Sequence, residues 1–163
     1  MDIGKFYFLS NAYLEVFNDL YLMKNSEEIN GVEHNRPCFF AFQDFNTMLY
    51  WVIPISSRTK KFEKIYNDKV KRNGYCDTIA FGEVLGHRKA FLIQNMCPIL
   101  PKFVENEYLD PLSLQAVRLN GVTERELISK AKKVLVLHRK GIKLIFPDVL
   151  AIEKQLLQSI CFD

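Results

Sequence analysis

Four apolar, strand-forming segments in the middle of the chain limit the folds that it can adopt. They run from Cys38 to Phe42, Met48 to Ile55, Thr78 to Val84 and Ala90 to Met96. Five residues separate the members of each pair. Connections this short are typical of antiparallel hairpins, because parallel strands need a crossover of a dozen residues or more. The sequence therefore predicts an antiparallel sheet at the centre of the molecule.

The ends of the chain show helical periodicity instead. Ser10 can cap a short helix that follows a first strand at Lys5 to Leu9. Thr123 and Glu126 match a capping box, which predicts a helix from there to about Lys140, ended by Gly141. A last helix is expected to begin near residues 147–148.

The remaining segments are less regular. Residues 24–36 are polar, with a turn signal at Asn30-Gly31, and predict a loop. Residues 60–71 carry only a thin apolar stripe and predict a short helix or a long excursion outside the core. Phe103 to Leu109 predicts one more strand. With helices segregated to the ends, the pattern predicts an α+β fold, a compact single domain in which helices pack on a twisted antiparallel sheet.

Composition and motifs exclude several classes of protein. The 163 residues are 48% hydrophobic and 25% charged, as in a globular domain, and no apolar run is long enough to span a membrane, so we expect a cytoplasmic protein. The four cysteines, Cys38, Cys76, Cys97 and Cys161, are scattered singly and are expected to be reduced thiols. Phosphate-loop, dinucleotide-binding and zinc-protease motifs are missing, and no metal or cofactor is expected.

Positive charge is concentrated in two stretches. Residues 58–72 hold seven basic and two acidic side chains, and residues 130–143 hold six basic and no acidic ones. Charge segregated in this way is typical of a surface that binds a polyanion, although two solvated helix faces would give the same pattern. The side chains expected to contact RNA are Arg58, Thr59, Lys61, Lys64, Lys69, Lys71, Arg72, Lys130, Lys133 and Arg139.

The segment PISSRTKK, residues 54–61, joins the end of a predicted strand to the first basic stretch. Ser56 and Ser57 supply adjacent hydroxyls, and several cations follow them. Such a group of donors suits a phosphate, and a lysine can stabilise a phosphorane without a metal ion. A serine turn that caps a basic helix is the alternative.

Three stretches together resemble the ToxN/AbiQ/CptN family, the protein toxins of type III toxin–antitoxin systems. KFYFLSNAYLEVF is similar to the opening strand and helix of the family, NRPCFFAF to its next strand, and PISSRTKK to its hydroxyl-and-lysine loop. The resemblance covers about the first third of the chain.

This resemblance implies a fold similar to MazF/Kid-type toxins and a metal-independent endoribonuclease that leaves 2′,3′-cyclic phosphate and 5′-hydroxyl ends. It implies that residues 1–163 form one toxin domain, inhibited by a pseudoknot antitoxin RNA that the toxin processes from a repeat precursor. Toxin and RNA would form a closed hetero-oligomer without a protein antitoxin, and cellular or phage RNA would be the substrate.

The resemblance also implies roles for individual residues. Ser57, assisted by Ser56, would orient the scissile phosphate, Arg36 would anchor a neighbouring phosphate, and Tyr13 would stack on a base or donate a hydrogen bond. Aligned without gaps, the family's lysine falls on Thr59, whereas an insertion of one residue supplies Lys60, to which we assign the role.

Two other classes of function remain open on the sequence alone. One is a non-catalytic RNA- or DNA-binding module that uses the basic faces 58–72 and 130–143. The other is a structural domain whose charges are merely solvated.

Overall fold

The fold is built around one long buried strand, β5 (Tyr50–Ser56), in a computed structural model that describes residues 1–160, apart from the side chain of Glu27. β5 pairs along one edge with β4 (Cys38–Gln43). Its other edge pairs first with β8 (Cys97–Ile99) and then with β7 (His87–Phe91). Pro54 lies between these two paired stretches, at the point where the partner strand changes.

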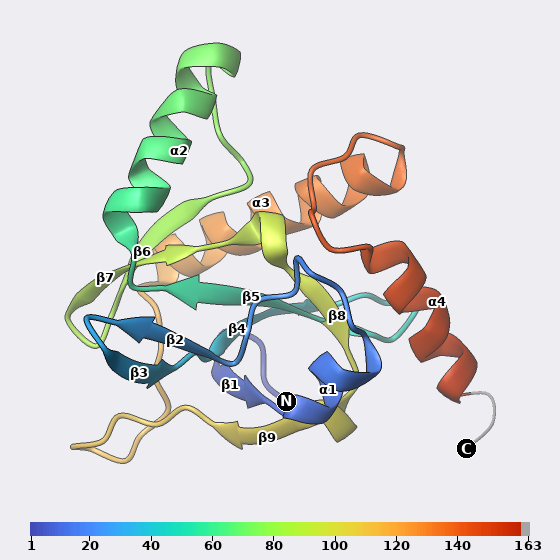
Figure 1. Ribbon diagram of the computed structural model, residues 1–163, viewed down its shortest axis with the longest axis horizontal. Coiled ribbons are helices and arrows are strands. Elements are labelled where there is room, and N and C mark those ends of the chain that lie inside the picture. The colour runs from blue at the N-terminus through green and yellow to red at the C-terminus, as the bar shows by residue number, and fades with distance from the viewer. Residues whose placement is uncertain (161–163) are drawn as a thin grey trace.

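The other strands complete a seven-stranded sheet in the order β6-β7-β5-β4-β1-β9, with β8 beside β5 (Figure 1). β6 is Ala80–Val84, β1 is Phe6–Leu9 and β9 is Val104–Glu107. Every pairing is antiparallel. The predicted α+β class, a compact domain with helices on an antiparallel sheet, is confirmed.

Within residues 1–160, four α-helices pack on this sheet. α1 (Asn11–Val16) follows β1, α3 (Gly121–Arg139) packs against β4, and α4 (Val149–Ile160) packs against β8. α2 (Thr59–Asn73) contacts β7 and projects beyond the sheet (Figure 1). No helix of the described residues is long and apolar enough to cross a membrane.

The core lies between the sheet and these helices. Its largest fully buried side chains include Trp51, Tyr13, Phe6, Phe39, Phe40 and Phe91. A second, smaller cluster forms where the thin apolar stripe of α2 meets the sheet, and Phe62 is the buried α2 residue in it. The segment 60–71 is thus part of a complete helix of 15 residues, and it stays at the margin of the core as predicted.

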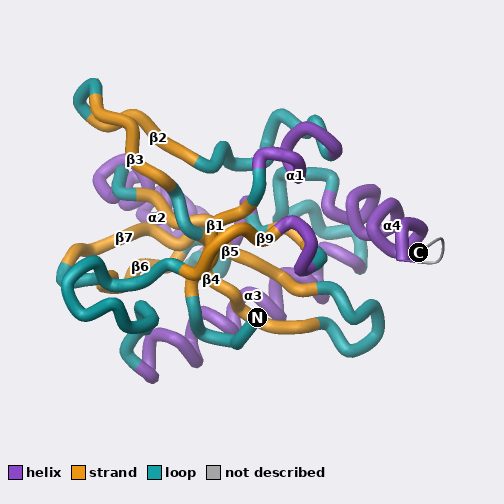
Figure 2. Tube along the Cα trace, turned by 90° about the horizontal axis from the view of Figure 1, so that it is seen from below, coloured by secondary structure: helices purple, strands orange, loops and turns teal. Residues whose placement is uncertain are grey.

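Three local predictions were wrong. The expected loop at residues 24–36 contains an antiparallel hairpin, β2 (Ser26–Ile29) and β3 (Val32–Asn35), which extends away from the rest of the molecule in Figure 2. Its exposed side chains show no apolar alternation, although Asn30 and Gly31 do form the turn, both with positive φ. α3 begins at Gly121, two residues before Thr123, because the side chain of Asn120 accepts the amide of Val122 and caps the helix.

The third error concerns the second hairpin. Its turn consists of Leu85 and Gly86 alone, both at positive φ, so residues 87–89 belong to β7 and not to a five-residue connection. The chain leaves the sheet after Phe91, and residues 93–95 form a 3₁₀ turn, η1 (Ile93–Asn95). A second such turn, η2 (Pro101–Phe103), precedes β9.

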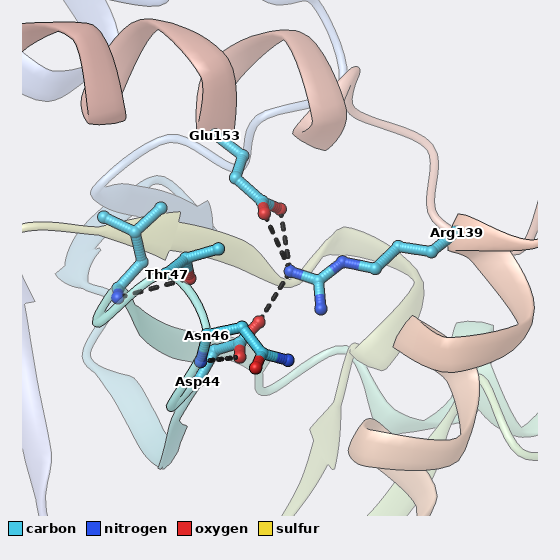
Figure 3. Close-up of polar contacts among 6 residues, drawn as sticks. Asp44, Asn46, Thr47, Arg139 and Glu153 are labelled. Atoms are coloured by element: carbon cyan, nitrogen blue, oxygen red, sulfur yellow. Dashed lines mark hydrogen bonds and ion pairs between the residues drawn. The ribbon is translucent and has the colours of Figure 1, made fainter.

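An ion network at one end of the sheet ties three elements together. Nη2 of Arg139, at the end of α3, lies 2.6 Å from Oδ2 of Asp44 in the β4–β5 turn, and 2.8 and 3.0 Å from the two carboxylate oxygens of Glu153 in α4 (Figure 3). Asp44 also accepts the backbone amide of Asn46 at 2.9 Å. Burial raises the pKa of Asp44, but the Asn46 amide and the Arg139 guanidinium outweigh it and hold the pKa below its ordinary value.

We expect Asp44→Asn to lower the free energy of unfolding by about 1–3 kcal/mol at neutral pH, since Arg139 loses a charged partner. Because the pKa of Asp44 is lowered in the folded protein, its contribution is complete above its unfolded pKa and is lost as the pH falls through the folded value. The difference between wild type and variant should therefore shrink below about pH 4. Urea unfolding followed by the fluorescence of Trp51, the single tryptophan, measures it. An equal difference at pH 3 and pH 7 would contradict this role.

Candidate functional site

A basic cleft opens where β5 ends and α2 begins. Its cavity of about 340 Å³ is lined by the side chains of Lys24, Arg36, Ser56, Arg58, Lys61 and Phe62, together with Glu28 and residues of the 20–26 segment. Four cations face one carboxylate there, which leaves a net positive charge. The cleft therefore suits an anionic ligand.

Strand β5 and the β2–β3 hairpin together shape this cleft. Ser56, the last residue of β5, is buried, and its hydroxyl accepts the backbone amide of Arg58 at 3.2 Å. The guanidinium of Arg58 reaches across and donates to the carbonyl of Glu28 in β2, at 2.8 Å. The cleft is thus bounded by two elements that are 30 residues apart in the chain.

Arg36 also lines the cleft. It is buried, and Nη1 donates to the carbonyl of Lys24 at 3.0 Å, while its backbone amide donates to the carbonyl of Asn25 at 2.6 Å. These bonds fix the side chain within the cleft. The structure therefore brings together Arg36, Ser56, Arg58 and Lys61 of the residues that the sequence indicated.

Ser57 meets a residue that sequence reasoning missed. Nζ of Lys89, in β7, donates to the hydroxyl of Ser57 at 2.5 Å. This contact follows from the pairing of the two strands, in which Ser56 is opposite Ala90 and Ile55 is opposite Phe91. The sequence analysis placed Lys89 in a five-residue connection. The one sequence signal for its place in β7 was the Leu85-Gly86 dipeptide, which forms a two-residue turn.

The two serines do not share one surface. Ser56 lines the cleft, whereas Ser57 is directed to Lys89 and is not among the residues that line it. Lys60 is exposed in the first turn of α2 and does not line the cleft either. Thr59 begins the helix, and its amide donates to the carbonyl of Ser57 at 2.9 Å.

The prediction that Tyr13 stacks on a base is wrong. Its side chain is fully buried, and its hydroxyl donates to the carbonyl of Pro98 at 2.8 Å. The ring packs against Phe17 and Phe103, with centroids at 4.9 and 5.4 Å. Burial raises the pKa of Tyr13 well above its ordinary value. The ring and the hydroxyl of Tyr13 therefore both make contacts within the core.

The second basic stretch also differs from the prediction. Arg139 is held by Asp44 and Glu153, Lys133 forms an ion pair with Asp77 at 2.6 Å, and Lys130 forms one with Glu126 at 3.0 Å. Asp44 and Asp77 are distant from residues 130–143 in sequence, so a count along that stretch could not find them. Arg139 connects three elements and is no longer a candidate for RNA contact. On α2, by contrast, Lys64, Lys71 and Arg72 are exposed.

Other reactive groups lie away from the cleft. Burial raises the pKa of Cys38, and it raises the pKa of Cys97 to about 12, so neither thiol ionises readily. Cys38, Cys76 and Cys97 are free, and Cys161 lies outside the described residues. Nδ1 of His138 accepts the amides of Leu144 and Ile145 and holds the chain after α3. Among residues 1–160, no three His, Cys, Asp or Glu side chains are grouped as a metal site.

The fold is similar to that of two solved structures. One solved structure is of a bacterial antiviral system that a processed non-coding RNA regulates. It matches with a TM-score of 0.63 and 16% identity over 94% of this chain and 97% of that chain. Another is AbiQ, a lactococcal anti-phage endoribonuclease of a type III toxin–antitoxin system, with a TM-score of 0.63 and 13% identity over 96% of this chain and 99% of that one.

No protein-family model and no curated protein sequence matches this chain. At 13–16% identity the two structures establish a common fold, and function has to be argued from the site itself. The expected resemblance to the fold of type III toxins is confirmed, and it extends over nearly the whole chain and not only its first third.

Tyr13→Phe tests the position of that ring. The variant keeps the packing but removes the hydrogen bond to Pro98, so we expect the free energy of unfolding to fall by about 1 kcal/mol and RNA affinity to stay the same. Tyr21→Phe is the control, because Tyr21 is more than half exposed. Urea unfolding and RNA titration measure the two quantities. Weaker RNA binding with unchanged stability would return Tyr13 to the site.

Proposed function

We propose that residues 1–163 form a single-domain, cytoplasmic endoribonuclease toxin of a type III toxin–antitoxin system. It cleaves cellular or phage RNA without a metal ion and leaves 2′,3′-cyclic phosphate and 5′-hydroxyl ends. A pseudoknot RNA, processed from a repeat precursor, inhibits it within a closed protein–RNA complex, and no protein antitoxin takes part. The observation that carries this proposal is the Ser57–Lys89 pair, in which Ser57 stands between the cleft-lining residues Ser56 and Arg58 in the chain, on a fold shared with AbiQ.

The reaction needs no nucleophile from the protein. The 2′-hydroxyl of the RNA loses its proton and attacks the adjacent phosphorus, so that a 2′-oxygen–phosphorus bond forms while the bond to the 5′-oxygen breaks. The leaving 5′-oxygen takes up a proton. The cyclic phosphate and the 5′-hydroxyl are then the two products, and the protein has to stabilise the additional negative charge on the phosphorane.

Lys89 is the side chain best placed to stabilise that charge. Its ammonium donates to the Ser57 hydroxyl, which can pass a hydrogen bond on to a phosphate oxygen. Arg36, Arg58 and Lys61 line the cleft and would hold the neighbouring phosphates. We therefore transfer the lysine role from Lys60 to Lys89, with Ser57 as its partner and Ser56 as a wall of the cleft.

Incubating the protein with RNA in EDTA tests the class of function. Cleavage that persists in EDTA and leaves 2′,3′-cyclic phosphate ends is the expected result, and mass spectrometry of the fragments identifies those ends. A mobility shift without cleavage would instead support the RNA- or DNA-binding module. If neither occurs, the charges are merely solvated and the proposal is wrong.

Lys89→Ala and Lys60→Ala compare the two lysines directly. Loss of a transition-state contact should lower the cleavage rate of Lys89→Ala about a hundredfold or more, and Ser57→Ala should behave similarly. Lys60→Ala removes the same charge from an exposed position and should cleave within about twofold of the wild type. Single-turnover cleavage of one RNA measures all three rates, and Trp51 fluorescence checks the fold. The opposite order, with Lys60→Ala inactive and Lys89→Ala active, would restore the role to Lys60.

A further inference from the structure

A second cavity, of about 480 Å³, lies between the C-terminal end of α2 and the chain that follows α3. We call it the aromatic pocket and define it by four of its lining residues, Lys69, Tyr75, Lys143 and Phe146. In Figure 1, the end of α2 and the chain after α3 stand on the same side of the sheet. Its volume is within the range of about 300–1,000 Å³ that is usual for ligand pockets.

Lys69 brings an uncompensated positive charge to this pocket. Its ammonium donates to the hydroxyl of Thr78 at 2.7 Å and to the side-chain oxygen of Gln94 at 2.9 Å, both neutral groups. No ion pair with a carboxylate is seen for Lys69 among the described residues. Burial lowers its pKa, and nearby Arg72 also acts against its charged form. A half-buried cation held only by neutral acceptors is stabilised by an anion from outside.

The other charges around the pocket do not cancel this one. Asp77 is the carboxylate in the lining, and Lys133 already pairs with it at 2.6 Å. Lys143 is exposed and adds a second cation at the rim. The pocket therefore favours a ligand that carries negative charge.

Exposed aromatic rings form the apolar part of the pocket. Tyr75 is 61% exposed and Phe146 is 40% exposed. The ammonium of Lys69 lies 5.8 Å from the centroid of Phe146, and that of Lys133 lies 5.2 Å from the centroid of Tyr75. Aromatic faces beside cations are the usual means by which proteins bind single-stranded nucleic acid, because bases stack on the rings and phosphates contact the cations.

Two segments of the chain extend to both the basic cleft and the pocket. Tyr21 packs against Phe146 with a centroid distance of 6.0 Å, and its two neighbours, Leu20 and Leu22, line the cleft. α2 likewise contributes Lys61 to the cleft and Lys69 to the pocket. These two positions are eight residues apart, which corresponds to a rise of about 12 Å along the helix.

We propose that the aromatic pocket binds one nucleotide of a single-stranded RNA that also occupies the basic cleft. The base stacks on Tyr75 and Phe146, and Lys69 and Lys143 contact the adjoining phosphates. This inference rests on the proposed function only in taking RNA as the ligand, and it does not require that the protein cleaves it.

Binding of 2′-O-methyl RNA tests the proposal, because this RNA lacks the attacking hydroxyl and stays intact. Oligonucleotides of about four and about twelve nucleotides separate the cleft from the combined site. We expect the wild type to bind the longer one more tightly by at least tenfold. Tyr75→Ala should lose about tenfold for the longer oligonucleotide and little for the shorter. Lys143→Ala should weaken binding of the longer one and reduce its salt slope by about one.

Matched controls come from the same chain. Phe45→Ala removes an aromatic ring that is 87% exposed in another part of the surface, and Lys140→Ala removes an exposed cation that does not line the pocket. Both should bind the longer oligonucleotide like the wild type. Equal affinity of the wild type for both lengths, or unchanged affinity of both pocket variants, would overturn the proposal.

Two further results separate this proposal from other readings. If a free nucleoside monophosphate binds the pocket and Tyr75→Ala abolishes that binding but not RNA binding, the pocket is a small-molecule site and the proposal is wrong. If unmodified RNA is not cleaved, while binding depends on length and on Tyr75, the endoribonuclease proposal fails and this one stands.

Discussion

The pairing of β5 on both of its edges is the constraint on which the rest of the structure depends. β4 covers one edge, and β8 and β7 share the other. Both edges of β5 are paired and residues on both of its faces are buried, so a slip by one residue would mismatch its hydrogen bonds and its packing on both faces. Because that register is fixed, Ser56 reaches the cleft and Ser57 reaches Lys89. The site is thus a consequence of how the sheet is assembled.

Sequence predicted the parts of the fold that local pattern determines. The apolar pairs gave both central hairpins, and Gly141 marked the end of α3, where its φ is positive. The β2–β3 hairpin was missed because its strands are held by backbone bonds and not by an apolar face. The start of α3 was missed because Asn120 and Thr123 are both good caps, and only the position of the preceding loop selects between them.

The candidate site was predictable only in part, because a local sequence pattern does not determine which side chains meet in space. Ser56, Arg58 and Lys61 were found from a short motif and a charge count, and Arg36 from the family resemblance, all of which identify residue types near the cleft. None of them can tell where a side chain points, so Tyr13 was placed at the surface although it is in the core. The acids that oppose the second basic stretch are distant in sequence, as Asp44 and Asp77 show. Charge segregation along a chain is therefore weaker evidence for a binding face than charge segregation on a surface.

The contact between Lys89 and Ser57 has a consequence for how such proteins are recognised. The pairing of β5 with β7 holds the Lys89 ammonium next to the Ser57 hydroxyl, although the two residues are 32 positions apart in the chain. A genome survey that requires a lysine within a few positions of the serines would discard a chain built in this way, although the two groups still meet in space. A survey that compares the residues facing each other on paired strands would retain it. For a site on an antiparallel sheet, a search pattern is then better defined by residues paired across strands than by consecutive residues in the sequence.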